Sequence, residues 1–346
     1  METTRRGGRA RSRRGFGAVL SVVVVAIALA VQIGGVAAQT RLSIATGGTG
    51  GVYYPYGGGL ANILSDSIDD IEVTAEVTAA SVDNMLLIES GDADMAFVLG
   101  DTAFDAVSGN APFEAPIEAY ALATLYDNYT HVVTTDDAGI NGVADLRGKR
   151  VSTGAPGSGT EVIANRMLEA AGLNPETDIE REQLGAAESA AAIKDRRLDA
   201  FFWSGGLPTG AVTDLGATPN IALKLVGNAD LTDGLSERYG DFYTTATIPG
   251  GTYPGQDEAV DVVVVPNLLV VGAEFDEQLA YDVIRVMLEN QPELVTVHPE
   301  ARNLTLENAS QNSPIPFHPG AIRFFEEMGV TPNASPEASP AASPPA

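Results

Sequence analysis

The chain has 346 residues, a length that suits two domains of about 150 residues better than one hydrophobic core. Apolar residues make up 45% and charged residues 19%, which predicts a globular chain rather than a disordered one. The net charge of −26 argues against nucleic acid as a partner, since phosphate binding needs clustered cations, and the absence of cysteine excludes disulfides and thiolate metal sites.

Residues 1–38 have the order of an export signal, with six arginines, an apolar run over 18–31 and small residues before Gln39. Ser12-Arg13-Arg14-Gly15-Phe16 fits a twin-arginine pattern, so Tat and Sec export both stay open. An uncleaved membrane anchor ranks second, because the apolar run is short for a span of roughly 20 residues. Removal of this segment leaves 14 cationic and 45 acidic side chains, as expected for a soluble protein on the periplasmic or cell-surface side.

Strands and helices alternate after this segment. Apolar strands are predicted at residues 42–45, 71–77 and 94–98. The glycine-rich loop 46–51 follows the first strand, and Pro55 suits the first turn of the next helix. Ser81 is predicted to cap a second helix, which Gly91 ends. This βαβαβ order predicts an α/β fold with a parallel sheet covered by helices.

A similar unit follows, with strands predicted at 149–153 and 199–203 and helices at 160–171 and 187–196. A second small-residue loop, 154–160, joins the first of these strands to its helix. Residues 89–97 and 194–202 both run from a helix end through a turn and an Asp into an apolar strand. This echo suggests two similar lobes, although many αβ junctions have the same pattern.

The last third of the chain is predicted to contain a β-rich stretch at 260–271, interrupted by Pro266, and a long helix near 276–289. If these elements return to the first lobe, the chain crosses between lobes twice. Lobe 1 is then residues 39–134 plus 262–330, and lobe 2 is residues 135–261. Residues 331–346 read as a disordered Pro/Ala/Ser tail that cannot bury a core.

The two small-residue loops are the clearest candidates for a binding site. Each joins a strand to a helix N-terminus, where free N–H groups and the helix dipole favour an anion. Neither has the spacing of a dinucleotide fingerprint or a P-loop. One such loop in each lobe could clamp a small carboxylate at the carboxyl ends of the strands. Ser158 and Glu161 also form a capping box, S-x-x-E, so a cap and a ligand contact are equally favoured for Ser158.

Aromatic residues near the loops could line a pocket. Tyr53, Tyr54 and Tyr56 follow the first loop, and core packing is expected for at least one of them. Trp203, the only tryptophan, lies at a strand end beside glycines, where a cleft position and a core position are equally plausible.

Patterns typical of enzymes are missing from the sequence. It contains no G-x-S-x-G, H-E-x-x-H or C-x-x-C, and its three histidines have no suggestive neighbours. Asp92-Ala93-Asp94 lacks the spacing of an EF-hand loop, so calcium is possible but not indicated. We expect no catalytic residues, no metal site and no cofactor.

Five motifs follow one another between about residues 41 and 330: Thr46-Gly47-Gly48-Thr49-Gly50-Gly51-Val52-Tyr53-Tyr54-Pro55, Ala80-Ser81-Val82-Asp83-Asn84, Leu146-Arg147-Gly148-Lys149-Arg150-Val151, Gly154-Ala155-Pro156-Gly157-Ser158-Gly159-Thr160-Glu161 and His318-Pro319-Gly320-Ala321. Together they resemble the TAXI family of solute receptors (TRAP-associated extracytoplasmic immunogenic proteins). The resemblance implies a type II periplasmic-binding-protein-like fold, in which a hinge joins two α/β lobes around a ligand cleft. The Pro/Ala/Ser tail departs from the usual family pattern.

The resemblance also implies a function. The protein would bind a small organic anion or amino acid, glutamate-like or dicarboxylate, deliver it to TRAP membrane permease subunits and catalyse nothing. The ligand-binding residues implied are Thr46, Gly47, Gly50, Val52, Tyr53, Ser81, Asn84, Asp101, Ser158, Gly159, Thr160 and Trp203. A ligand sensor of the same fold that acts on a signalling partner is an alternative, and an exported α/β enzyme is a weaker one.

Overall fold

The computed structural model describes residues 1, 2, 4 and 39–334. Residues 40–334 belong to one compact unit. The export signal and most of the Pro/Ala/Ser tail lie outside the described residues, so both stay predictions. Within the described ranges, no helix combines the length and the apolar character that a membrane span needs.

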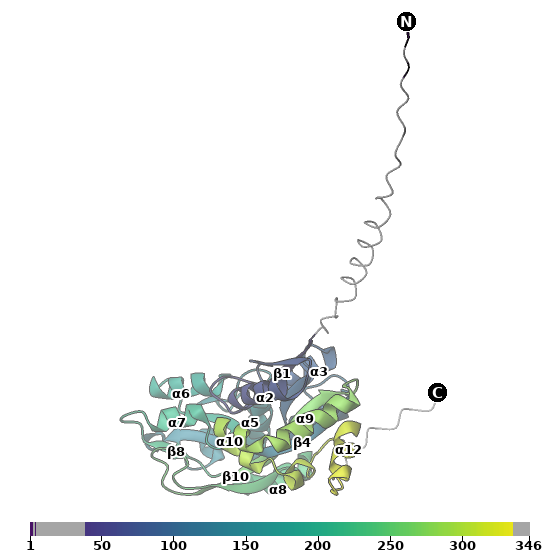
Figure 1. Ribbon diagram of the computed structural model, residues 1–346. Helices are drawn as coiled ribbons and strands as arrows, with labels where there is room; N and C mark the ends of the chain where they lie inside the picture. The colour runs from purple at the N-terminus through teal and green to yellow at the C-terminus, as the bar shows by residue number, and fades with distance from the viewer. Residues whose placement is uncertain (3, 5–38, 335–346) are drawn as a thin grey trace. The chain divides into compact units, whose positions relative to one another are not determined.

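One mixed sheet organises the compact unit (Figure 1). Its strands follow the order β2-β1-β3-β10-β4-β7-β5-β6, with β8 beside β4 and β9 beside β10. The strands are β1 Thr40–Ala45, β2 Ile71–Glu76, β3 Met95–Leu99, β4 Ala119–Thr135, β5 Arg150–Ser152, β6 Glu180–Glu182, β7 Ala200–Gly205, β8 Leu223–Leu225, β9 Thr244–Ile248 and β10 Val260–Gly272. The predicted α/β class is confirmed.

The two halves of the sheet repeat one strand order. In the first half, the parallel strands β2-β1-β3 are followed by the antiparallel β10 and then by β4. In the second half, β6-β5-β7 are followed by the antiparallel β4 and then by β8. The long strands β4 and β10 therefore serve both halves. This repeat agrees with the predicted periplasmic-binding-protein-like fold, while the residue boundaries of the two lobes stay a prediction.

Helices connect the strands of both halves. They are α2 Tyr53–Ser67, α3 Ser81–Ser90, α4 Gly100–Ser108, α5 Gly159–Ala170, α6 Ala186–Lys194, α7 Gly210–Gly216, α8 Thr232–Tyr239, α9 Glu277–Glu289, α10 Gln291–Val297, α11 Leu306–Ala309 and α12 Pro319–Glu327, with 3₁₀ helices η1 Asp136–Ala138, η2 Val143–Leu146, η3 Ala229–Leu231 and η4 Pro299–Asn303. The largest buried apolar cluster comes from residues 42–126 and 268–325. Two further clusters come from residue 99 and residues 132–265, so each half has its own core.

The structure corrects two details of the predicted elements. Ser81 does not cap α3, because Ala80 is the N-cap residue and the Ser81 Oγ accepts a hydrogen bond from the Leu99 N–H at 3.1 Å. Pro266 does not end its strand, since β10 continues through it with a shift of register against β4 between Pro266 and Leu268. Helix α4 and strand β4 have no counterpart among the predicted elements.

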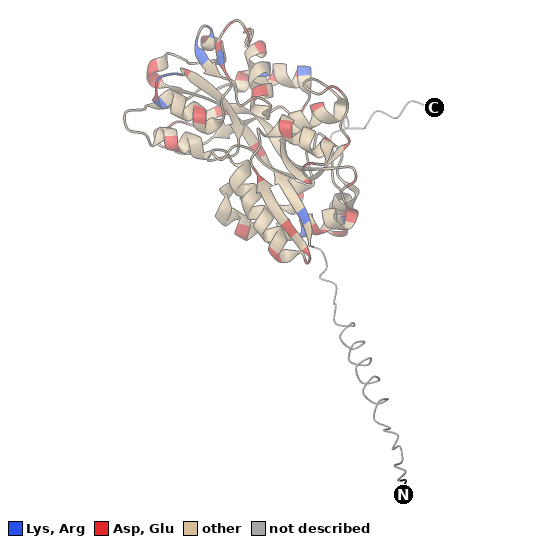
Figure 2. Cartoon of the chain, turned by 90° about the horizontal axis from the view of Figure 1, so that it is seen from above, with Lys and Arg blue, Asp and Glu red and all other residues tan. Residues whose placement is uncertain are grey.

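Acidic side chains are distributed over many helices and loops of the compact unit, and Lys and Arg occur at fewer places (Figure 2). This distribution agrees with the net charge of −26. An anionic ligand would have to be held by local fields that act against the charge of the whole protein.

Candidate ligand-binding site

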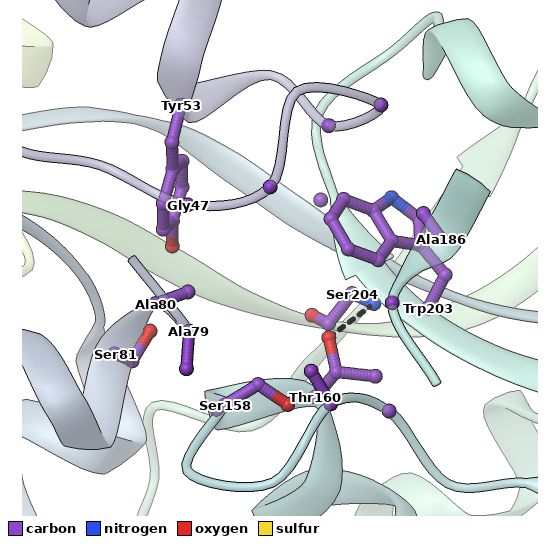
Figure 3. Close-up of a pocket in the computed structure, with 18 of the residues that line it drawn as sticks. Gly47, Tyr53, Ala79, Ala80, Ser81, Ser158, Thr160, Ala186, Trp203 and Ser204 are labelled. Carbon is purple, nitrogen blue, oxygen red and sulfur yellow. Dashed lines mark hydrogen bonds between the residues drawn. The ribbon is translucent and has the colours of Figure 1, made fainter. Parts of the chain in front are cut away.

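A cavity of about 270 Å³ lies between the two small-residue loops (Figure 3). The first half lines it with residues 47–53, 78–81 and 99, and the second half with residues 154, 155, 158–160, 184–188 and 203–205. Most of these residues are small, and the volume lies just below the range of about 300–1,000 Å³ that is usual for ligand pockets. The cavity therefore suits a small molecule held by both halves.

Nine of the twelve predicted ligand-binding residues line this cavity. They are Gly47, Gly50, Val52, Tyr53, Ser81, Ser158, Gly159, Thr160 and Trp203. The structure thus brings together residues that lie more than 150 positions apart in the chain. Their role as ligand contacts stays a prediction. The remaining three, Thr46, Asn84 and Asp101, are not among the lining residues.

Thr46 and Asn84 hold the first loop in place. The Thr46 Oγ1 donates a hydrogen bond to the carbonyl oxygen of Glu76 at 2.5 Å. The fully buried Asn84 Nδ2 donates to the carbonyl oxygens of Thr46 and Phe97, each at 2.8 Å. Asn84 therefore ties the residue after β1 to strand β3 and so positions the first loop.

Asp101 belongs to a buried ionic cluster between α4 and α5. Its Oδ2 accepts a hydrogen bond from the Tyr243 hydroxyl at 2.6 Å and lies 3.5 Å from Arg166, which also pairs with Asp105 at 2.5 Å. Burial raises the pKa of Asp101 and raises that of Asp105 to about 6, although Arg166 opposes both shifts. These contacts join helix α4 of the first half to helix α5 of the second half. The positive charge of Arg166 is paired with the two aspartates.

Four helices begin at the cavity. The N-cap residues of α2, α3, α5 and α6 are Val52, Ala80, Ser158 and Gly185, and all four line it. The N–H groups of a first helical turn have no acceptor within their helix, and the helix dipole adds positive potential there. The dipoles of four such ends make this space favourable for an anion, although the Val82 and Asp83 N–H groups of α3 already donate to the Gly157 carbonyl oxygen and none of the described lining residues is Lys or Arg.

Two hydroxyl groups of the second loop each accept one hydrogen bond and keep their own O–H donor free. The Ser158 Oγ accepts a hydrogen bond from the Glu161 N–H at 3.1 Å, and Glu161 accepts one from the Gly157 N–H at 3.0 Å, so the predicted cap at Ser158 is present. The Thr160 Oγ1 accepts from the Ser204 N–H at 3.2 Å (Figure 3). Because both oxygens accept in these bonds, each hydroxyl retains its proton for a ligand oxygen.

The first loop reaches across to the second half. The Gly50 carbonyl oxygen accepts a hydrogen bond from the Ala211 N–H at 3.1 Å. Gly51 lies so close to the Trp203 ring that a Cβ atom on Gly51 would be 2.7 Å from Cη2. Only glycine fits at this position while the ring stays where it is.

The second loop makes the reciprocal contact. The Gly157 carbonyl oxygen accepts hydrogen bonds from the N–H groups of Val82 and Asp83, both at 3.1 Å. Gly157 has a φ of 79°, a region that favours glycine. Main-chain contacts from both loops therefore hold the two halves together beside the cavity.

A chain of hydrogen bonds orients Trp203. Its Nε1 donates to the Thr209 Oγ1 at 2.8 Å, and the Thr209 N–H donates to the Tyr253 hydroxyl oxygen at 3.1 Å. That hydroxyl lies 2.8 Å from His131 Nε2. Burial lowers the pKa of His131 to about 4, so the ring is neutral near pH 7 and accepts the Tyr253 proton. The indole is therefore a fixed wall of the cavity.

The sequence prediction missed residues 184–188, which also line the cavity. Gly185, Ala186 and Ala187 follow the short strand β6 and open α6, which repeats the small-residue pattern of the two predicted loops. Glu188, in the first turn of α6, is the one acidic side chain among the described residues that line the cavity. A search for every small-residue junction between a strand and a helix would have found this segment.

Metal ligands do not gather in the part of the chain that the structure describes, where no group of three or more His, Asp or Glu side chains could hold an ion. The possibility of calcium beside the ligand is not tested by this observation.

Residues 44–329 match the model of a protein family described as the NMT1-like family. The chain belongs to the NMT1-like family. The members of this family are periplasmic solute-binding proteins, so this NMT1-like protein is a receptor and not an enzyme.

Among solved structures, this NMT1-like protein is similar to a protein of Bordetella bronchiseptica RB50, with 17% identity and a TM-score of 0.51 over 86% of this chain and 91% of that one. The periplasmic aliphatic sulphonate binding protein SsuA of Escherichia coli is 14% identical, with a TM-score of 0.45 over 84% of this chain and 79% of that one. The GluR0 ligand binding core, solved with L-glutamate, is 10% identical, with a TM-score of 0.47 over 78% of this chain and 99% of that one. At 17% identity, the likeness to the Bordetella protein concerns the fold and not the ligand.

Proposed function

We propose that this NMT1-like protein is the extracytoplasmic solute receptor of a TRAP-type secondary transporter. It binds a small carboxylate or amino acid, glutamate-like or dicarboxylate, in the cavity and delivers it to membrane permease subunits. The resemblance to TAXI receptors supports the transporter class, and three of its five motifs contribute lining residues. The export-type sequence at residues 1–38 supports a location outside the cytoplasm.

The convergence of four helix N-termini on one cavity carries the proposal. Backbone N–H groups and the hydroxyls of Ser158 and Thr160 supply donors for a carboxylate. Because the cavity walls are mostly Gly, Ala, Val and Leu, these donors act at a lower dielectric than in water, which strengthens them. The contacts between the halves also give ligand binding a means to favour the arrangement that the permease recognises.

A thermal-shift screen tests the ligand class. The purified chain is freed of bound ligand by unfolding and refolding, then melted with glutamate, glutamine, 2-oxoglutarate and succinate, each with and without calcium. A ligand at 100 times its Kd adds about 2.7 kcal/mol to the free energy of unfolding. For a unit of about 300 residues this is a rise in Tm of about 4 °C. If every small acid leaves the Tm of the folded protein unchanged, the carboxylate assignment is wrong.

Uptake measurements test the partner. Vesicles that contain TRAP membrane permease subunits should accumulate the bound acid when an ion gradient and the loaded receptor are both present. Omission of the receptor should abolish uptake. Accumulation that does not depend on the receptor would contradict the delivery role and favour a sensor.

A further inference from the structure

Helix α6 brings a carboxylate to the cavity. Glu188 lies in the first turn of α6, three positions after the N-cap residue Gly185. A Cβ atom on Gly185 would lie 2.6 Å from the Glu188 Oε2, so the carboxylate folds back over the start of the helix. Both residues line the cavity. The carboxylate therefore lies at the end of α6 that faces the ligand space.

This carboxylate is accessible and has no partner. Glu188 is exposed, and none of the hydrogen bonds or ion pairs among the described residues involves its side chain. Glu161, in the first turn of α5, differs in both respects, since it is half-buried and paired. Its Oε1 lies 2.6 Å from Arg181, and its Oε2 accepts a hydrogen bond from the Gly157 N–H at 3.0 Å. Glu161 therefore holds segments of the protein together, whereas the Glu188 carboxylate is free to contact a ligand.

The charges at the cavity favour a ligand that carries both signs. The helix N-termini supply partial positive charge for a carboxylate. None of the described lining residues is Lys or Arg, so a second carboxylate would find no cationic side chain there and would be repelled by Glu188. An ammonium group has three N–H donors and no acceptor, which matches an unpaired carboxylate. A ligand with one carboxylate and one ammonium group therefore satisfies both features of the cavity.

The starts of α5 and α6 adjoin the same wall of the cavity. Figure 3 shows Ala186, in the first turn of α6, on the side of Trp203. It also shows Thr160, in the first turn of α5, bonded to Ser204, the residue that follows Trp203. The cavity has a volume of only about 270 Å³. One small molecule can therefore place its carboxylate at the start of α5 and its ammonium group at Glu188.

We propose that Glu188 binds the ammonium group of the ligand and thereby selects amino acids over acids of the same size that lack an amino group. The inference rests on the proposed function, in which the ligand's carboxylate lies at the helix N-termini. The preferred solute is then a small amino acid, and a dicarboxylate without an amino group binds more weakly. Val52, Leu99 and Leu184 offer apolar surface to the rest of the ligand.

Two pairs of ligands that differ by one amino group test this selectivity. Calorimetry on the purified chain, freed of bound ligand, compares glutamate with glutarate and valine with 3-methylbutanoate. The amino acid of at least one pair should bind about tenfold more tightly than its partner, because hydrogen bonds between charged groups are among the stronger ones. Equal or tighter binding of both acids that lack the amino group overturns the assignment and leaves the proposed carboxylate receptor standing. If none of the four compounds binds, the ligand class of the proposed function fails, and the assignment fails with it.

A variant assigns the selectivity to Glu188. Glu188→Gln keeps the size of the side chain and removes its charge, so we expect an unchanged Tm of the ligand-free protein and a fall of the preference to about threefold or less. Glu182→Gln is the matched control, because it removes the same charge from an exposed residue of β6 that is not among the lining residues. The control should keep the full preference. An undiminished preference in the Glu188→Gln protein, or an equal loss in both variants, would show that Glu188 does not hold the ammonium group.

Discussion

Replacement of Gly51 by alanine tests whether the contact between the first loop and Trp203 belongs to ligand binding. The added Cβ would lie 2.7 Å from Cη2 and 2.9 Å from Cζ2 of the indole, closer than real Cβ contacts, so one of the two must move. Overpacking of this kind costs about 1–3 kcal/mol. The proposed receptor mechanism expects the halves to separate when the ligand leaves, which would remove the clash, so we expect the penalty to fall on the liganded arrangement. The Kd should rise by about 5- to 150-fold.

Calorimetry with the acid found in the screen measures this change, and the Tm of the ligand-free protein shows whether the fold is retained. Gly48→Ala is the control, because it lies in the same loop and its Cβ would meet nothing within 4 Å. Combining Gly51→Ala with Trp203→Phe should recover part of the affinity, since a smaller ring leaves room for the methyl group. Equal affinities of the Gly51→Ala and Gly48→Ala proteins would refute the reasoning.

Three further changes have definite expected results. Ser158→Ala with Thr160→Ala should lower the Tm, as loss of the cap costs about 0.5–2 kcal/mol, and should raise the Kd in calorimetry; unchanged affinity would remove the second loop from the binding site. Burial raises the pKa of Asp105 to about 6, so its contribution to stability is full below about pH 4 and lost as the pH rises through 6. Asp105→Asn should flatten that part of the pH profile of Tm, and a constant difference from wild type between pH 4 and 7 would contradict the shift. Glu188→Gln should lower the Kd for succinate a few-fold at low salt and have little effect in 1 M salt, whereas weaker binding of glutamate by this variant would show that Glu188 holds an ammonium group.

Local sequence patterns predicted the parts of the site that local chemistry decides. The two small-residue loops were placed because glycine, a preceding strand and a following helix lie next to one another in the chain. The Ser158 cap was predicted from S-x-x-E, and the bond between Ser158 and Glu161 is present. Ser81 shows the limit of the same reasoning, since a hydroxyl at a helix start can serve the neighbouring strand instead of its own helix.

Long-range pairing decided what the patterns did not indicate. Strand β4 is buried along nearly its whole length between β10 and β7, so its sequence lacks the alternation that marks a half-exposed strand. Asp101 was predicted at a strand end beside the ligand. In the structure it forms an ion pair with Arg166, which lies 65 residues further along the chain. No spacing rule links those two positions.

The sequence by itself determined the α/β class, the two loops and the acidic character of this NMT1-like protein, because strand and helix periodicity, glycine and charge act within a few residues. The tertiary structure alone decided that four helix N-termini share one cavity and that the Trp203 ring lies against Gly51. These arrangements depend on β4 and β10 running through both halves of the sheet. Packing between segments more than 100 residues apart is a property of the folded chain, and no local pattern records it.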